Sequence, residues 1–118
     1  MNEIKRDIKL LVPELQGKII CLLDLLEKHN IPMKIFETLR TAKRQEELFK
    51  KGFSKTLKSK HIEGRACDMV VHFDEKWSWA NEYIYLYKMM GCLVEKIGGL
   101  TWGGSWKWKD YAHIELKV

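Results

Sequence analysis

The amino-acid sequence predicts one α+β domain, residues 1–118, in which helices pack on one face of a small antiparallel sheet. A chain of 118 residues is long enough to bury one hydrophobic core and too short for a second domain. Segments with apolar residues at helical spacing are interspersed with segments in which apolar and polar residues alternate. Helices are expected over 14–29, 42–51 and 80–97, and strands over 32–39, 65–73, 99–106 and 111–118.

Start and stop signals define the expected helices. A short helical turn in the first ten residues is followed by Pro13, and proline suits the first position of a helix because its missing N–H costs nothing there. Thr41 is a plausible N-cap for the second helix. Gly52 and Gly98 follow the second and third helices, where glycine commonly ends a helix.

Alternation along the strands assigns side chains to faces. In 65–73, Asp68 lies on the face opposite Cys67, so Cys67 points into the core and is excluded as a metal ligand. His72 shares the face of Asp68 but lies about 13 Å away at the usual strand rise, too far to bind the same ion. In the last strand, His113 and Glu115 lie on the face away from the core.

Composition limits the classes of partner. The net charge of +5 suits an anionic partner, which could be nucleic acid, a membrane surface or an anionic cell wall. Zinc-finger cysteine pairs and an Arg-rich recognition helix are both missing from the sequence, which argues against nucleic acid. No apolar run approaches the ~20 residues needed to span a bilayer. The charged N-terminus carries no visible signal peptide, which predicts synthesis in the cytoplasm.

Two short stretches carry the residues suited to metal chemistry, SKHIEGRACD and DYAHIE. The first contains His61 and Asp68, and the second contains Asp110 and His113. Two imidazoles and one carboxylate make a three-ligand zinc site with a fourth position open, as in catalytic zinc sites. The remaining carboxylate can then serve as a general base.

Three sequence blocks, in order, resemble a known enzyme family. HIEGRACD fits the pattern H-x-x-G-x-A-x-D of zinc-dependent peptidoglycan peptidases. FETLRTAKRQEELFKKG and GLTWGGSWKWKDYAHIEL are similar to the blocks before and after that motif, so the resemblance covers most of 31–118. The family includes D-alanyl-D-alanine carboxypeptidases of the VanY type and the L-alanyl-D-glutamate endopeptidases of phage endolysins. It implies a hedgehog/DD-peptidase-like fold.

The resemblance also implies a role for each site residue. His61, Asp68 and His113 would hold zinc (Zn2+), and Asp110 would take the proton of the attacking water. Taken alone, Arg40 at a strand–helix junction is more typical of a surface salt bridge. The resemblance instead implies that its guanidinium stabilises the oxyanion of the tetrahedral intermediate, a task suited to a group that is always charged.

Four further residues complete the expected site. Ser59 and Gln45 are expected to contact substrate, and Trp106 to line the cleft, although a packing role fits its block of tryptophans equally well. Glu115 lies on the same side as His113 and either orients that imidazole or is an exposed strand carboxylate. The lysine-rich segment 50–60 is either a solvated surface or an electrostatic guide for an anionic substrate.

The function implied by the resemblance is zinc-dependent hydrolysis of the peptidoglycan stem peptide at the L-alanyl-D-glutamate bond. Aspartate at position 110 resembles the endopeptidase branch, because the carboxypeptidase branch tends to use glutamate. The alternatives are a D-alanyl-D-alanine carboxypeptidase and a non-catalytic zinc-containing wall-binding module, the latter disfavoured by intact Asp110 and Arg40. The protein is expected to be a monomer that binds peptidoglycan, does not bind nucleic acid and does not insert into a membrane. It is expected to reach the wall through a holin or during lysis.

Overall fold

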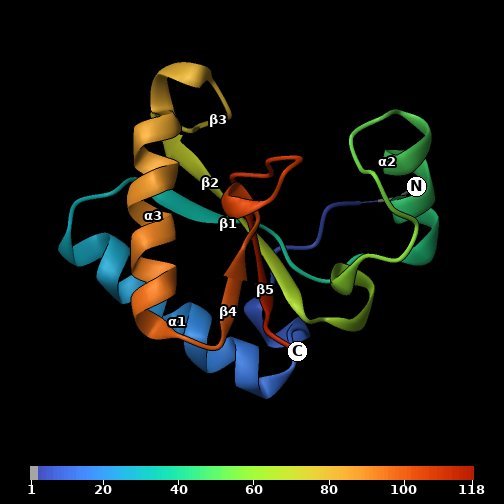
Figure 1. The fold of residues 1–118 in the computed structure, drawn as a ribbon, viewed down its shortest axis with the longest axis horizontal. Helices are drawn as coiled ribbons and strands as arrows, with labels where there is room; N and C mark the ends of the chain where they lie inside the picture. The colour runs from blue at the N-terminus through green and yellow to red at the C-terminus, as the bar shows by residue number, and fades with distance from the viewer. Residues whose placement is uncertain (1–2) are drawn as a thin grey trace.

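The structure is a computed structural model that describes residues 3–118. These residues form one antiparallel sheet with two helices packed on one face (Figure 1). The α-helices and strands are α1 (Pro13–Lys28), β1 (Met33–Glu37), α2 (Ala42–Lys50), β2 (Ala66–Phe73), β3 (Lys76–Ser78), α3 (Ile84–Ile97), β4 (Leu100–Trp102) and β5 (His113–Leu116). Short 3-10 turns lie at Ile8–Leu10, Lys60–Glu63, Asn81–Tyr83 and Gly103–Ser105.

The sheet is arranged around β2. Its strand order is β1-β2-β5-β4, and β3 forms a hairpin with β2. The antiparallel register places Asp68 of β2 opposite Glu37 of β1 and opposite His113 of β5. One position on the central strand is therefore within reach of side chains from both neighbours.

The core lies between the sheet and the helices α1 and α3, which pack against each other. Its fully buried side chains include Leu15, Ile19, Leu22, Met69, Met90 and Ile114. The α+β fold class is confirmed. The remaining helix, α2, lies apart from α1 and α3 (Figure 1), and Gln45 is its only buried residue. Its polar sequence AKRQEELFK has no apolar face broad enough to join the main core.

Helix and strand ends agree with most of the expected signals. Pro13 opens α1, the hydroxyl of Thr41 accepts a hydrogen bond from the Arg44 N–H, and Gly52 has the left-handed φ of 78°. In the first ten residues only Ile8–Leu10 is helical; Met1 and Asn2 lie outside the described residues.

The segment DEKWSW contains β3, a strand that is not among those expected from the sequence. Asp74 and Glu75 have φ of 51° and 61° and make the two-residue turn before β3. Three residues are too few for alternation to be visible, so β3 has no period-two signal. The strands expected over 32–39 and 111–118 are shorter at both ends.

Trp102 is fixed between two glycines next to the site. Its indole N–H donates to the Tyr111 carbonyl at 2.7 Å. A Cβ at Gly91 of α3 would lie 2.5 Å from Cε3 of its ring, and a Cβ at Gly104 would also collide with the indole. The ring therefore fills space that a larger residue at either position would need.

We expect Gly91→Ala to lower the free energy of unfolding by about 1–3 kcal/mol, because the added methyl group overpacks the ring of Trp102. Gly17→Ala is the matched control: Gly17 is exposed on α1 and a Cβ there meets nothing within 4 Å. This control should gain about 0.5–1 kcal/mol from helix propensity. Urea denaturation measures both, and equal stability of the two variants would contradict the packing argument.

Candidate metal centre

Three residues from separate segments bring metal-binding atoms together. His61 comes from the turn Lys60–Glu63, Asp68 from β2 and His113 from the start of β5. Their candidate ligand atoms all lie within 4.8 Å of one another. Nε2 of His61 is 3.2 Å and Nδ1 of His113 is 3.4 Å from Oδ1 of Asp68. This is the set that the motif analysis expected.

The outer nitrogen of each imidazole is bound by the protein. Nδ1 of His61 lies 2.7 Å from the Thr38 carbonyl oxygen, and Nε2 of His113 lies 2.8 Å from Oε1 of Glu115. A carbonyl and a carboxylate can only accept, so these outer nitrogens carry the protons. The inner nitrogens can then present lone pairs to an ion, as metal-binding histidines do. Glu115 contacts His113 as the sequence analysis expected of an orienting residue.

Two buried atoms at the centre have no hydrogen-bond partner among the described residues: Nε2 of His61 and Oδ1 of Asp68. Although they lie 3.2 Å apart, both present lone pairs when Nδ1 of His61 holds its proton. Two acceptors buried face to face are unfavourable unless a cation lies between them. The two imidazoles and the carboxylate therefore fit a divalent metal, and this donor set suits zinc in particular.

The second oxygen of Asp68 is already bound. Arg40 donates from NH2 to Oδ2 of Asp68 at 3.2 Å and to Oε1 of Glu37 at 2.8 Å, and from NH1 to Oε1 of Gln45 at 2.8 Å. Arg40 is 8% exposed and lines the cleft described below. Its contact with Oδ2 leaves Oδ1 as the oxygen that faces the histidines.

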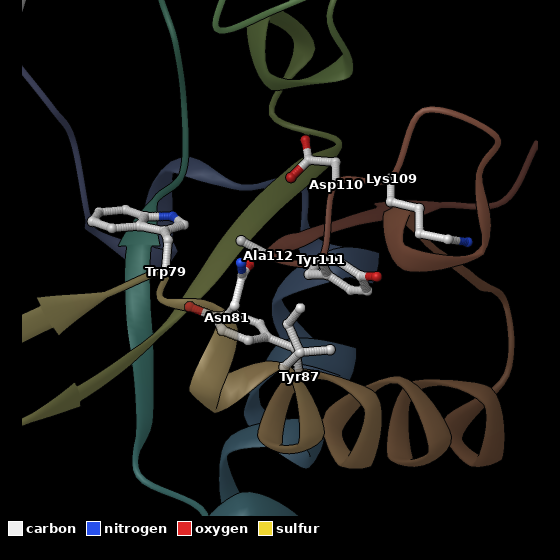
Figure 2. Close-up of a pocket in the computed structure, with 8 residues that line it drawn as sticks. Trp79, Asn81, Tyr87, Lys109, Asp110, Tyr111 and Ala112 are labelled. Atoms are coloured by element: carbon white, nitrogen blue, oxygen red, sulfur yellow. The ribbon is translucent and has the colours of Figure 1, made fainter.

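Asp110 is held beside the site by a close backbone approach. Its N–H donates to the Gly103 carbonyl at 3.0 Å, and its carbonyl accepts from the His113 N–H at 3.2 Å. A Cβ at Gly103 would collide with the Asp110 carbonyl oxygen, which explains why residue 103 is a glycine. Figure 2 shows Asp110 at the edge of a cavity of about 200 Å³, with its carboxylate directed away from Asn81 and Tyr87.

The pKa values of the two aspartates of the site are shifted in opposite directions. Burial alone would raise the pKa of Asp68, but His61 and His113 hold it well below its ordinary value. Burial, and next the negative charge of Asp68, raise the pKa of Asp110. Burial lowers the pKa of His113, yet hydrogen bonds with Asp68 and Glu115 raise it to about 9. Such divergence between neighbouring carboxylates separates an ionised ligand from a proton acceptor.

A cleft of about 880 Å³ opens over these residues and includes Asp68, Asp110 and His113 in its wall. Its aromatic side chains are Phe36, Phe53, Trp79, Trp106 and Trp108. Its basic side chains are Arg40, Arg44, Lys55, Lys58, Lys60 and Lys109. The lysine-rich segment 50–60 thus contributes three lysines to the cleft wall, and α2 lies along one side of the cleft.

The three residues expected to contact substrate differ in whether they line the cleft. Trp106 lines the cleft, with its ring centroid 5.0 Å from that of His113. Ser59 also lines it, but its hydroxyl accepts a hydrogen bond from the His61 N–H. Gln45 is a correction: it is fully buried and lies outside the cleft wall. Its amide binds Arg40, so it supports the site from behind instead of meeting substrate.

Two exclusions agree with the structure. Cys67 is buried in the core, and burial followed by the charge of Asp68 raises its thiol pKa well above the ordinary value. His72 lies outside the metal-binding group and packs its ring 4.5 Å from that of Trp77. The alternation along β2 was sufficient to predict both.

Two contributing residues escaped the sequence analysis. Glu37 is a buried carboxylate bound to Arg40 and Arg44. No clear signal for it exists in the sequence, because β1 carries a second charged residue, Lys34, which is exposed. Thr38 acts through its main-chain carbonyl, for which a sequence offers no signal.

The comparison with known proteins identifies the family. The sequence model described as phage L-alanyl-D-glutamate peptidase matches residues 5–118. The chain belongs to this family. The predicted resemblance is therefore confirmed, over a longer stretch than the three blocks that indicated it.

Two relatives illustrate this membership in the phage L-alanyl-D-glutamate peptidase family. The chain is 30% identical over 96 residues to the L-alanyl-D-glutamate peptidase of Listeria phage A118. The matched stretch covers 80% of this chain and 34% of that protein. It thus spans about a third of the length of that relative. The crystal structure of the Serratia marcescens L-Ala D-Glu endopeptidase ChiX is similar over 99% of this chain and 90% of that one, with a TM-score of 0.78 and 28% identity. Among residues 3–118, no helix is long and apolar enough to cross a membrane.

We expect zinc to raise the melting temperature of chelator-treated protein and to raise that of Asp68→Asn much less, because the variant lacks the charged ligand. A ligand at 100 times its Kd stabilises a protein by about 2.7 kcal/mol. His72→Asn is the control, since His72 lies on the same strand outside the group. Differential scanning fluorimetry measures the shifts. A full shift in Asp68→Asn would show that this triad is not the zinc site.

Proposed function

We propose that this chain is a zinc-dependent peptidoglycan hydrolase that cuts the stem peptide at the L-alanyl-D-glutamate bond. The observation that carries the proposal is the convergence of the candidate ligand atoms of His61, Asp68 and His113 beside Asp110, a carboxylate with a raised pKa, within one cleft. Membership in the phage L-alanyl-D-glutamate peptidase family supports the choice of bond. It favours this reading over a D-alanyl-D-alanine carboxypeptidase or a wall-binding module.

In this proposal His61, Asp68 and His113 hold the zinc. When bound, zinc supplies Lewis-acid polarisation of the scissile carbonyl and activation of the attacking water. Thr38 and Glu115 fix the two imidazoles in the tautomers that leave the inner nitrogens free. This arrangement needs no rotation of either ring before the ion binds.

Asp110 is the general base. Its raised pKa makes its carboxylate a better proton acceptor than Asp68, whose pKa is lowered. It takes the proton of the attacking water and then returns a proton to the leaving amine. The close approach of Gly103 and the hydrogen bond to the His113 N–H hold Asp110 beside the metal-binding residues.

Arg40 stabilises the oxyanion that forms when the carbonyl is attacked. Three of its five N–H donors are used by Glu37, Gln45 and Asp68. One NH1 hydrogen and the N–H of Nε remain. Nε is buried and has no partner among the described residues, so the NH1 hydrogen is the donor proposed to meet the oxyanion. A guanidinium held by three acceptors has little freedom to reorient, which is the property an oxyanion-binding group needs.

The cleft suits an anionic peptide attached to a sugar. Its lysines match the free carboxylates of the stem, including that of D-glutamate. Trp106, with Ser59 at the cleft wall, is placed to contact the substrate next to His113. All proposed site residues come from one domain, residues 1–118, so we propose that a monomer is sufficient. As an endolysin it would act on the cell wall, which it would reach through a holin or during lysis.

Products released from purified peptidoglycan test the reaction. We expect stem peptides that begin with D-glutamate, with L-alanine left on the glycan, and loss of this release when zinc is chelated. Mass spectrometry of the soluble fraction identifies the new ends. Release of free D-alanine alone would instead assign a carboxypeptidase. No cleavage by zinc-loaded protein would favour a binding module.

Asp110→Asn should lower kcat by about 10²–10⁴-fold, the usual contribution of a general base, while zinc content stays at the wild-type level. Asp24→Asn is the control, because Asp24 is an exposed carboxylate on α1. Steady-state kinetics and metal analysis of the same preparations separate the two effects. Near-normal kcat in Asp110→Asn with zinc bound would assign the base to another group.

A further inference from the structure

Glu37 is a buried carboxylate with a defined task beyond the catalytic residues. We propose that it is a positioning residue: it holds Arg40 so that Arg40 binds only one oxygen of Asp68, which leaves the other oxygen to the metal. The inference rests on the proposed function in that it takes the His61–Asp68–His113 triad as a zinc site.

The contacts of Glu37 use both of its oxygens. Oε1 accepts from NH2 of Arg40 at 2.8 Å and from NH2 of Arg44 at 3.2 Å. Oε2 accepts from Nε of Arg44 at 2.6 Å. The residue is 1% exposed, so these bonds are formed out of water, where charge-assisted hydrogen bonds are strong.

The sheet register explains why such a residue is needed. Glu37 of β1 lies directly opposite Asp68 of β2. Two carboxylates facing each other across neighbouring strands repel. NH2 of Arg40 donates to both, at 2.8 Å to Glu37 and at 3.2 Å to Asp68. Arg44 supplies the second positive charge, so two carboxylates are matched by two guanidinium groups.

Gln45 completes the support by holding the other arm of Arg40. Its Oε1 accepts from NH1 of Arg40 at 2.8 Å, and its Nε2 donates to Ser54 Oγ at 2.8 Å and to the Thr56 carbonyl at 2.6 Å. Glu37 and Gln45 therefore hold NH2 and NH1 of the same guanidinium from two sides. Neither arm is free to turn toward Asp68 with both donors.

The consequence of losing Glu37 follows from arginine geometry. A guanidinium prefers to bind a carboxylate with two parallel hydrogen bonds. Without the charge of Glu37, only the neutral amide of Gln45 competes with the charged Asp68 for the guanidinium, so Arg40 can turn to bind both oxygens of Asp68 in this way. Oδ1 would then accept a hydrogen bond from Arg40 and compete poorly for the metal. Glu37 thus sets the affinity of a site that it does not touch.

The test measures zinc affinity by competition with a chromophoric chelator, on folded protein. We expect Glu37→Gln to weaken zinc binding by about 10–100-fold, the range found when a group that supports a metal ligand is removed. Glu46→Gln is the matched control: Glu46 is a carboxylate of α2 that pairs with Lys50 at the exposed surface. Its affinity should equal that of the wild type. Equal affinity in Glu37→Gln would overturn the proposal.

A double variant separates positioning from general destabilisation. Lysine cannot form the two-pronged contact, so Glu37→Gln combined with Arg40→Lys should regain most of the zinc affinity lost in Glu37→Gln. A merely structural role for Glu37 predicts no such recovery. Gly91→Ala, destabilised at Trp102 away from the triad, should melt earlier yet bind zinc as the wild type does. Failure of the double variant to recover affinity would overturn the mechanism.

Folding and function are kept apart in this design. Should Glu37→Gln not fold, Glu37→Asp replaces it: the charge stays but the shorter side chain loses the Arg40 contact, so weaker zinc binding supports the proposal and unchanged binding overturns it. The affinity readout needs no hydrolysis. A wild type that binds no zinc would overturn both the proposed function and this inference, whereas zinc binding that ignores Glu37 would overturn this inference alone.

Discussion

The meeting of two imidazole nitrogens and one carboxylate oxygen at one buried point is the constraint on which the rest of this structure depends. Nε2 of His61 and Nδ1 of His113 both face Oδ1 of Asp68, an arrangement that suits a bound cation. The sheet makes the arrangement possible, because the register of β2 puts His113 directly opposite Asp68. A one-residue slip of β5 would turn His113 into the core.

The N-terminal segment supports His61 through hydrogen bonds with Thr38 and with Gly64. The Lys5 carbonyl accepts a hydrogen bond from the Thr38 N–H at 2.7 Å, and the Thr38 carbonyl in turn accepts from His61. On the other side, the Val12 N–H donates to the Gly64 carbonyl, and a Cβ at Gly64 would lie 2.9 Å from the Leu10 carbonyl oxygen. Gly64 has a left-handed φ of 70°. The small residue in the motif is therefore required by packing and by backbone conformation together.

The sequence predicted the metal-binding triad and its faces, since these follow from a motif and from alternation along β2 and β5. It also predicted the starts of α1 and α2 from Pro13 and Thr41. It placed the start of the third helix at residue 80, whereas α3 begins at Ile84 after a 3-10 turn. It was wrong about Gln45 and silent about Glu37 and Thr38. Those roles depend on which long-range partner a side chain or carbonyl meets, and periodicity assigns a residue to a face without assigning its partner. The place of α2 beside the cleft escaped for the same reason.

Arg40 shows why the support of a site and its chemistry cannot be assigned to separate residues. Its contact with Asp68 fixes the ligand oxygen, and the NH1 hydrogen that Gln45 leaves free is the donor proposed to meet the oxyanion. Both tasks require the same orientation of one planar group. The orientation is fixed by Glu37 and Gln45 before any substrate arrives, so no reorganisation is needed when charge develops on the carbonyl oxygen. Because Glu37, Gln45 and Asp68 use three of the five donors, even a small displacement of the guanidinium would move the free NH1 donor away from the oxyanion.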